Sequence, residues 1–298
     1  MYANYFLINE EFLSHFDGKI KEDLSELAYK MYVSNCSKKT KKLSKSQYFT
    51  SKSTHYPVIF FYCPKCKSSQ MCVSLGIKNG ESMKYCPYCG DASMDHRFNL
   101  GVEKVMNLFR LSLSIKDTPQ SSKEVNQCIV TTLCSVYEVY LREFYADILN
   151  LRYVRGNYSL YNKFLRDCKN DFISPGKTFD RFKKELQLNY KSIIGEQNYK
   201  ALGLLSDYRN VIVHNNGICD DKFISKYPDV ERHSQILPSL KSLAALIHAV
   251  VDSANKLSVI YEQQIYDAVV DYISERIQQY KYDNSGEPIL PSIFFQRP

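Results

Sequence analysis

Apolar residues repeat every three or four positions along most of the chain beyond residue 99, and this pattern decides the fold class. The longest repeat covers about seven helical turns. Its members are Val125, Ile129, Leu133, Val136, Tyr140, Phe144 and Ile148. A second long helix is predicted from Pro238 and Ser239 to about Tyr280. Shorter helices are predicted around Val102–Phe109, at Leu160–Cys168 and at Thr178–Tyr190. We therefore expect a mainly α protein in which residues 99–282 form a helical bundle.

The first 50 residues combine expected helices with a basic segment. Residues 1–35 have helical spacing, and five lysines fall within eight positions of the stretch that follows, 37–45. This stretch has two interpretations: a solvated linker, or an electrostatic arm for a nucleic-acid backbone. Residues 1–100 hold 14 Lys and Arg against 9 Asp and Glu. That bias suits an anionic partner without requiring one.

Four of the ten cysteines have the spacing of a metal site. They form two C-x-x-C pairs, Cys63 with Cys66 and Cys86 with Cys89, in the predicted domain 51–98. Short strands are expected at Val58–Tyr62 and Gln70–Leu75. A redox dithiol explains one such pair but not two, whereas four thiolates complete a closed tetrahedral site for structural Zn²⁺. Residues 58–92 resemble the zinc ribbon family, whose members bind nucleic acid or a partner protein.

The stretch 208–217 places a permanent cation, Arg209, five residues ahead of a titratable imidazole, His214. Val211–Val213 followed by Asn216 and Gly217 is also typical of a strand entering a hairpin turn. A helical stripe runs into the stretch, however, and a lone strand there would lack a pairing partner. We therefore predict a helix over Asn198–Val213. Gly217 ends it with a positive φ, and His214 lies in the last turn, where the helix dipole favours its protonated form.

The motif Arg209-Asn210-x-x-x-His214-Asn215 resembles the R-x4-H motif of HEPN domains (higher eukaryotes and prokaryotes nucleotide-binding). The order of long and short helices over roughly residues 100–280 is similar to that all-helical fold. The resemblance implies a metal-independent endoribonuclease that cuts single-stranded RNA, in many members as a toxin or an anti-phage defence effector. It also implies an acidic residue on the first long helix, here Glu138, that steadies Arg209.

The chemistry of the motif can be argued separately. Cleavage by the 2′-hydroxyl needs a base, an acid and positive charge on the phosphate. Residues five apart on a helix diverge by about 140°, so one copy supplies the two groups in imperfect register. We therefore expect a homodimer, in line with the resemblance, and products with a 2′,3′-cyclic phosphate and a 5′-hydroxyl.

Each site residue has a role and an alternative. Arg209 would hold the phosphate or instead pair with Glu138 or another buried acid. His214 would move the proton or only cap the helix. Asn210 and Asn215 would orient the imidazole or the RNA, although Asn215 has the simpler alternative of a cap.

Three further expectations follow from composition. No apolar run approaches the ~20 residues of a membrane span, and Glu10 and Glu11 are unlike a signal peptide, so we expect a cytoplasmic protein. The tail 283–298 has no periodicity and is expected to be irregular. Because a free ribonuclease is toxic, an inhibitor or activating partner protein is expected. The alternatives are a non-catalytic nucleic-acid or protein-binding module with a zinc ribbon adaptor, and, on the basic arm alone, a DNA-binding regulator.

Overall fold

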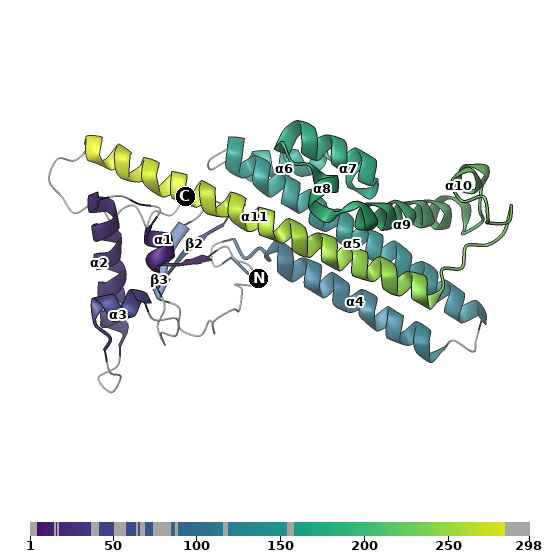
Figure 1. The fold of residues 1–298 in the computed structure, drawn as a ribbon, viewed down its shortest axis with the longest axis horizontal. Helices are drawn as coiled ribbons and strands as arrows, with labels where there is room; N and C mark the ends of the chain where they lie inside the picture. The colour runs from purple at the N-terminus through teal and green to yellow at the C-terminus, as the bar shows by residue number, and fades with distance from the viewer. Residues whose placement is uncertain are drawn as a thin grey trace. The chain divides into compact units, whose positions relative to one another are not determined.

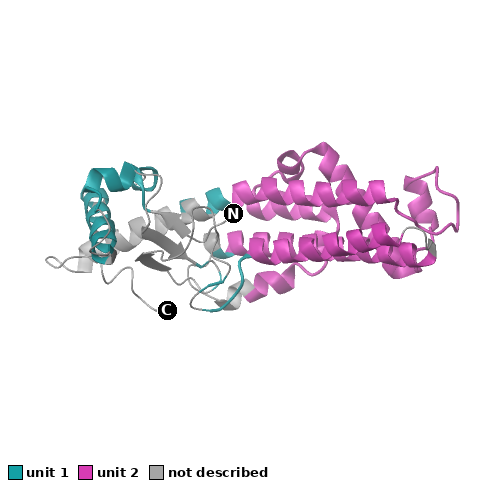
Figure 2. Cartoon of the chain, turned by 90° about the horizontal axis from the view of Figure 1, so that it is seen from below, with its two compact units in different colours: residues 1–93, 150–161, 262–298 teal, residues 94–149, 162–261 magenta. Residues whose placement is uncertain are grey.

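The structure is a computed structural model, and the chain is mainly helical (Figure 1). It describes residues 5–14, 16, 18–36, 42–50, 58–63, 65, 69–73, 85–86, 89–115, 119–153 and 158–283. The chain divides into two compact units, coloured separately in Figure 2. Unit 1 comprises residues 1–93, 150–161 and 262–298, and unit 2 comprises residues 94–149 and 162–261. The segment 37–41 of the lysine-rich stretch and the tail 284–298 lie outside the described residues.

Unit 1 contains a small antiparallel sheet and short helices. Its strands, in the order β1-β2-β3, are β1 (Tyr5–Leu7), β2 (Val58–Tyr62) and β3 (Ser69–Val73). Phe60 of β2 pairs with Phe6 on one side and Met71 on the other. The helices are α1 (Glu10–Leu13), α2 (Gly18–Asn35) and α3 (Lys45–Thr50). Tyr48 of α3 packs on Tyr32 of α2, with ring centroids 4.5 Å apart.

The strand predictions for this unit are partly confirmed. β2 has the predicted bounds, and β3 begins and ends within two residues of the predicted strand. The prediction that residues 1–35 form helices alone is wrong at its start, where Tyr5–Leu7 forms β1. The local pattern of this short segment does not show its pairing, because the partner strand β2 lies more than 50 residues away.

Unit 2 is built around four long helices that lie side by side in Figures 1 and 2. They are α4 (Met94–Ser114), α5 (Pro119–Tyr153), α9 (Glu196–Asn215) and α11 (Leu240–Asp283). α5 and α11 also continue into the residues assigned to unit 1, and the first four residues of α6 (Tyr158–Asp167) are assigned to unit 1 as well. The remaining elements are shorter: α6 (Tyr158–Asp167), η1 (Asp171–Ile173), α7 (Pro175–Arg181), η2 (Phe182–Leu186), α8 (Tyr190–Ile194) and α10 (Asp221–Lys226).

The predicted long helices are confirmed, with two differences in the helices that were predicted to be shorter. α4 begins at Met94, five residues before the helical domain was expected to start. The single helix predicted over Thr178–Tyr190 is divided into α7, the π-helical turn η2 and the start of α8. The break occurs because Gln187 adopts a left-handed φ of 58° and Asn189 caps α8 by accepting a hydrogen bond from the Ser192 N–H. Neither the left-handed Gln187 nor the Asn189 cap can be read from the spacing of apolar residues, because both depend on contacts in the folded chain.

The predicted apolar stripes form the core of unit 2. Ile129, Leu133 and Phe144 of α5 are fully buried, as are Val250 and Leu257 of α11. Buried hydroxyls join the two helices at polar points. The Tyr140 hydroxyl donates to the Ala254 carbonyl at 2.9 Å, and the Tyr261 hydroxyl donates to Asp147 Oδ2 at 2.7 Å. These bonds satisfy polar groups that would otherwise be buried without partners.

One stretch of α11, Leu240–Gln264, is long and apolar enough by length and composition to cross a membrane. This differs from the expectation that no apolar run approaches the length of a membrane span. Part of this stretch is buried inside the protein, including Leu243 and Val250. It also carries an ion pair, in which Lys256 Nζ lies 2.7 Å from Asp252 Oδ2. A core helix of a bundle has the same combination of features.

Candidate functional site

The Arg-His stretch lies at the C-terminal end of α9, so the prediction of a helix rather than a strand is confirmed. The helix runs to Asn215, and His214 lies in its last turn. Asn216 (φ 51°) and Gly217 (φ 79°) are both left-handed, and both donate their N–H groups to the Val211 carbonyl. The predicted positive φ of Gly217 is therefore confirmed, although Asn216 makes the first left-handed step. This pair turns the chain sharply away from the helix axis.

A small apolar cluster holds the following segment against the end of α9. Val211, Cys219, Phe223 and Ile236 are buried together, and Tyr208 packs against them. The backbone adds an isolated bridge between Ile218 and Gln235. Asp207 of α9 accepts hydrogen bonds from Lys226 Nζ and, at 3.1 Å, from the Tyr227 hydroxyl of the next segment. The loop and α10 are thus fixed to α9 by apolar and charged contacts.

The structure brings Arg209, Asn210 and His214 together. Arg209 Nη1 lies 3.2 Å from His214 Nε2 and 3.2 Å from Asn210 Oδ1. The backbone positions of Arg209 and His214 diverge around the helix, as expected, but the long arginine side chain spans that angle. The two groups expected to be in imperfect register are therefore in direct contact within one chain.

This contact constrains the imidazole as a hydrogen-bonding group. A guanidinium has only N–H donors, so a hydrogen bond between the two side chains uses His214 Nε2 as its acceptor. His214 and Asn210 are exposed and Arg209 is half-buried, so a ligand can reach the pair from solvent.

Glu138 of α5 interacts with Arg209 through charge, without forming an ion pair within the described residues. Burial raises the pKa of the half-buried Glu138 carboxyl above its ordinary value, while the nearby cations Arg142 and Arg209 oppose that rise. Burial also raises the pKa of the Cys134 thiol to about 11, again against the charge of Arg209. Arg209 therefore lies near the acid of α5, but its hydrogen bonds go to Asn210 and His214.

Asn215 makes a different contact from the one expected if it oriented the imidazole. Its Nδ2 donates to Asp220 Oδ2 at 2.9 Å. Asp220 in turn caps α10 by accepting the Phe223 N–H at 2.8 Å, and this bond is the main cause of the lowered pKa of its carboxyl. Asn215 thus joins the end of α9 to the start of α10.

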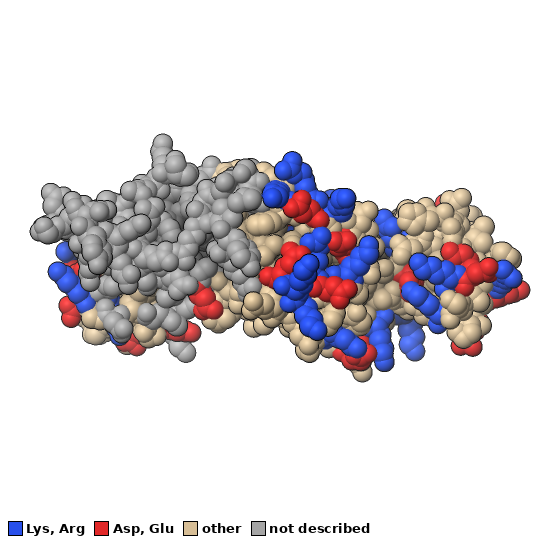
Figure 3. Space-filling view, turned by 90° about the horizontal axis from the view of Figure 1, so that it is seen from above, with Lys and Arg blue, Asp and Glu red and all other residues tan. Residues whose placement is uncertain are grey.

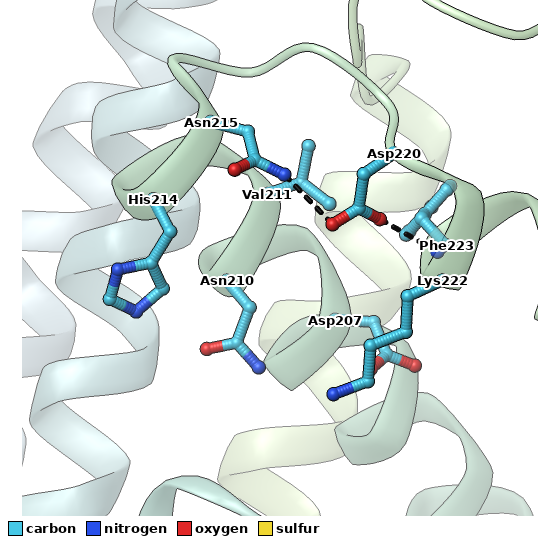
Figure 4. A pocket seen from close by; sticks show the side chains of 8 residues that line it. All are labelled: Asp207, Asn210, Val211, His214, Asn215, Asp220, Lys222 and Phe223. Carbon is cyan, nitrogen blue, oxygen red and sulfur yellow. Dashed lines mark hydrogen bonds between the residues drawn. The ribbon is translucent and has the colours of Figure 1, made fainter.

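A surface pocket of about 320 Å³ adjoins His214 (Figure 4). Five of its lining residues come from α9, with the spacing of one helix face, and three come from the α10 segment. They are Asp207, Asn210, Val211, His214, Asn215, Asp220, Lys222 and Phe223. The sequence reasoning missed Asp207, Asp220 and Lys222. The helical spacing of Asp207, Asn210 and His214 was the available signal.

Three of the four predicted metal ligands lie together in unit 1. The sulfur atoms of Cys63, Cys86 and Cys89 all lie within 4.8 Å of one another, and Cys66 lies outside the described residues. The second knuckle is tightly curled, because the Cys89 N–H donates to Cys86 Sγ at 3.5 Å and Gly90 has a φ of 71°. Lys65 Nζ pairs with Asp91 at 2.8 Å and so joins the two knuckles. A set of converging thiolates fits a soft, tetrahedral ion such as Zn²⁺.

Acidic and basic side chains are interspersed over the described surface of the face seen in Figure 3. On this face the described residues form no broad area of one sign. On this face, therefore, charge alone does not single out a site for an anionic ligand.

No protein-family model matches the chain, and neither the curated proteins nor the solved structures contain a match to it.

Proposed function

We propose that the protein is a metal-independent endoribonuclease of the HEPN type that cleaves single-stranded RNA at Arg209 and His214. The observation that carries the proposal is the 3.2 Å contact between Arg209 Nη1 and His214 Nε2 at an exposed helix end. It supports the proposal because a guanidinium, which can bind phosphate, and an imidazole, which can accept a proton, lie side by side, and the R-x4-H resemblance suggests the reaction class. A toxin or anti-phage defence effector in the cytoplasm, held in check by an inhibitor or an activating partner, is the corresponding biological role.

The first step is binding of the scissile phosphate. A phosphate oxygen is a stronger acceptor for a guanidinium than a neutral imidazole. The incoming phosphate therefore accepts the hydrogen bond from Arg209 Nη1 in place of His214, which leaves His214 Nε2 without this bond. Asn210 keeps its bond to the same nitrogen, which carries two N–H groups, and so maintains the orientation of the guanidinium.

The second step is attack of the 2′-oxygen on phosphorus, with transfer of the 2′-hydroxyl proton. His214 Nε2 accepts the proton of the 2′-hydroxyl as the 2′-oxygen bonds to phosphorus and the bond to the 5′-oxygen breaks. The leaving 5′-oxygen takes a proton from His214 of the partner subunit, in its imidazolium form. The products are a 2′,3′-cyclic phosphate and a 5′-hydroxyl, and Arg209 stabilises the charge that develops on the phosphate.

Exposed apolar side chains beside the site support the proposed homodimer. Four of them, which we call the end patch, are Leu111, Leu113, Ile218 and Leu237. Leu111 and Leu113 adjoin Ser112, and Leu237 adjoins Pro238, in a bonded chain in which Ser112 Oγ donates to Asn126 Oδ1 and Asn126 Nδ2 donates to the Pro238 carbonyl. Exposed apolar side chains that gather on a surface mark protein interfaces.

The cysteine cluster is proposed to hold structural Zn²⁺ through Cys63, Cys66, Cys86 and Cys89. The converging sulfur atoms of the three described cysteines support this, and a site filled by four thiolates leaves no position for substrate. In this proposal the zinc stabilises unit 1 as a ribbon, and catalysis does not involve it. Purified protein should contain about one zinc ion per chain, and Cys86→Ser should lower that content. A zinc content far below one would contradict the site.

The test of function uses purified full-length protein, a labelled single-stranded RNA and EDTA, with zinc content measured before and after. Wild type should cut the RNA, and His214→Ala and Arg209→Ala should each slow cutting by about 100-fold or more. The surface variants His248→Ala and Arg110→Ala are matched controls. Equal cutting by wild type and His214→Ala, or a requirement for added metal, would contradict the proposal. RNA binding without cleavage would favour the non-catalytic binding module.

A further inference from the structure

We infer that the pocket beside His214 binds the base of the nucleotide whose phosphate lies on Arg209, and that it selects guanine or uracil. The inference rests on the proposed function, since it places the phosphate at Arg209 and His214. Asn210 and His214 are four residues apart on α9, so they are neighbours on one face of the helix. A nucleotide with its phosphate at His214 therefore has the pocket directly beside it (Figure 4).

The size of the pocket fits one nucleotide unit. Its volume of about 320 Å³ is at the lower end of the roughly 300–1,000 Å³ range of small-molecule sites. Buried Val211 and Phe223 supply an apolar wall, and the polar groups lie around it. An aromatic base with polar edges has the complementary character.

The two carboxylates in the pocket already have hydrogen-bond partners within the protein. Both oxygens of Asp207 accept from Lys226 Nζ, at 2.7 and 2.9 Å. The oxygens of Asp220 accept from the Phe223 N–H and from Asn215 Nδ2. These acids therefore hold α9 and α10 together, and they are poor candidates for reading a ligand.

Two of the groups left to face a ligand, on Asn210 and Lys222, are donors. Asn210 Oδ1 accepts a hydrogen bond from Arg209. A guanidinium can only donate, so the oxygen of the Asn210 amide must face Arg209, and the NH₂ of the same amide is directed to the other side. Within the described part of the chain, neither this NH₂ nor the exposed Lys222 ammonium has a hydrogen-bond acceptor or an ion-pair partner. Together they offer adjacent donors that complement carbonyl or ring-nitrogen acceptors.

The charge of the pocket favours a neutral base over a second phosphate. Asp207 and Asp220 are both negative, Lys226 offsets the first, and Lys222 is the remaining cation among the lining residues. A dianionic phosphate in this space would lie close to both carboxylates. Phosphate is thus better placed outside the pocket, against Arg209.

The donor set also discriminates among bases. Guanine presents O6 and N7 as acceptors, and uracil presents O4, whereas adenine and cytosine present an amino donor at the corresponding position. The amino group of adenine or cytosine would face Lys222 and the Asn210 NH₂, which are also donors, so these groups could not hydrogen-bond to one another. Sites built to pair with a polar group reject analogues that cannot supply the matching partner.

The experiment measures binding of the four nucleoside 3′-monophosphates to full-length protein by titration calorimetry. Wild type should bind the guanosine and uridine nucleotides roughly tenfold more tightly than the adenosine and cytidine nucleotides. Lys222→Ala should reduce that ratio to less than about threefold with an unchanged unfolding midpoint. Arg209→Ala should weaken all four equally. Lys200→Ala removes an exposed lysine of α9 that does not line the pocket, and it should leave the four affinities unchanged.

The outcomes for the pocket and for the proposed function can be told apart. Equal affinity for the four nucleotides, or no measurable binding, overturns the pocket assignment while RNA cleavage by wild type still supports the enzyme. A base preference that Lys222→Ala leaves unchanged also overturns it. A base preference lost in Lys222→Ala, in a protein that does not cut RNA, supports the pocket and contradicts the endoribonuclease.

Discussion

Two glycines in the helices of unit 2 differ in what surrounds them. A Cβ added at Gly101 of α4 would lie 2.6 Å from Val136 Cγ2 and 2.7 Å from Cγ1 of the same side chain on α5. A Cβ added at Gly203 of α9 would meet nothing within 4 Å. Gly101 therefore permits a close approach of α4 and α5, whereas no neighbouring atom requires a glycine at position 203.

Replacing the two glycines with alanine should have opposite effects. Alanine gains roughly 0.5–1 kcal/mol over glycine within a helix. At Gly101, overpacking against a stiff β-branched side chain costs typically 1–3 kcal/mol, so the variant should be destabilised by about 1 kcal/mol. Gly203→Ala should be stabilised by up to about 1 kcal/mol. Urea unfolding measures both, and Val136→Ala should remove the penalty at Gly101. Equal stabilisation of the two variants would contradict the close approach.

At the scale of elements, a polar cluster joins α9 to α11. Asp252 Oδ2 accepts from Asn198 Nδ2 at 2.7 Å and pairs with Lys256, whose Nζ also donates to the Ile194 carbonyl. Lys256 and Asn198 together lower the pKa of the Asp252 carboxyl below its ordinary 3.8. A lowered pKa means that the folded state favours the ionised acid, so this contribution to stability is present above pH 3.8 and is lost as the pH falls through the folded value.

Asp252→Asn should therefore remove a pH-dependent contribution to the free energy of unfolding. Because the pair is partly exposed, the loss near pH 7 should be that of a surface ion pair, about 0.2–1 kcal/mol. The difference between wild type and variant should shrink as the pH falls below about 4. Unfolding midpoints in urea across this range provide the measurement, with the exposed Asp229→Asn as control. A difference that stays constant with pH would show that charge is not its cause.

The helices were predictable because apolar spacing is local. The buried stripe that contains Ile129 and Tyr140 follows directly from the sequence, and so does the helical state of the Arg-His stretch. β1 was not predictable, because its pairing partner is remote. The contact between Arg209 and His214 was missed because angular spacing ignores the reach of a long side chain. The pocket was missed because Lys222 and Asp207 lie on different elements, which the cluster around Val211 and the bonds of Asp207 to Lys226 and Tyr227 bring together.

At the scale of the whole molecule, the end patch and the Arg-His site both belong to unit 2. Leu237 is 60% exposed, and Val259 on α11 is 64% exposed. Neither side chain contributes much to the core, so replacing either should leave the monomer folded. They differ in position relative to the proposed interface.

Leu237→Lys should weaken self-association and RNA cleavage together, whereas Val259→Lys should leave both unchanged. A lysine in the centre of an apolar interface is buried without a partner, so a loss of at least tenfold in dimer affinity is expected. Sedimentation at several protein concentrations, with cleavage rates at the same concentrations, gives both quantities. A wild-type monomer that cuts at a rate per molecule independent of concentration would contradict the composite site.

The pocket is lined by a single short stretch of chain, from Asp207 to Phe223. Closing so short a loop is fast and loses little chain entropy, so the pocket can assemble early in folding from neighbours in sequence. Under the inference above, base selectivity would depend on this one stretch, at the end of α9, while α5 and α11 contribute none of the lining residues. If the protein cuts RNA as proposed, substitutions within this stretch would change the cleavage preference while leaving α5 and α11 unchanged.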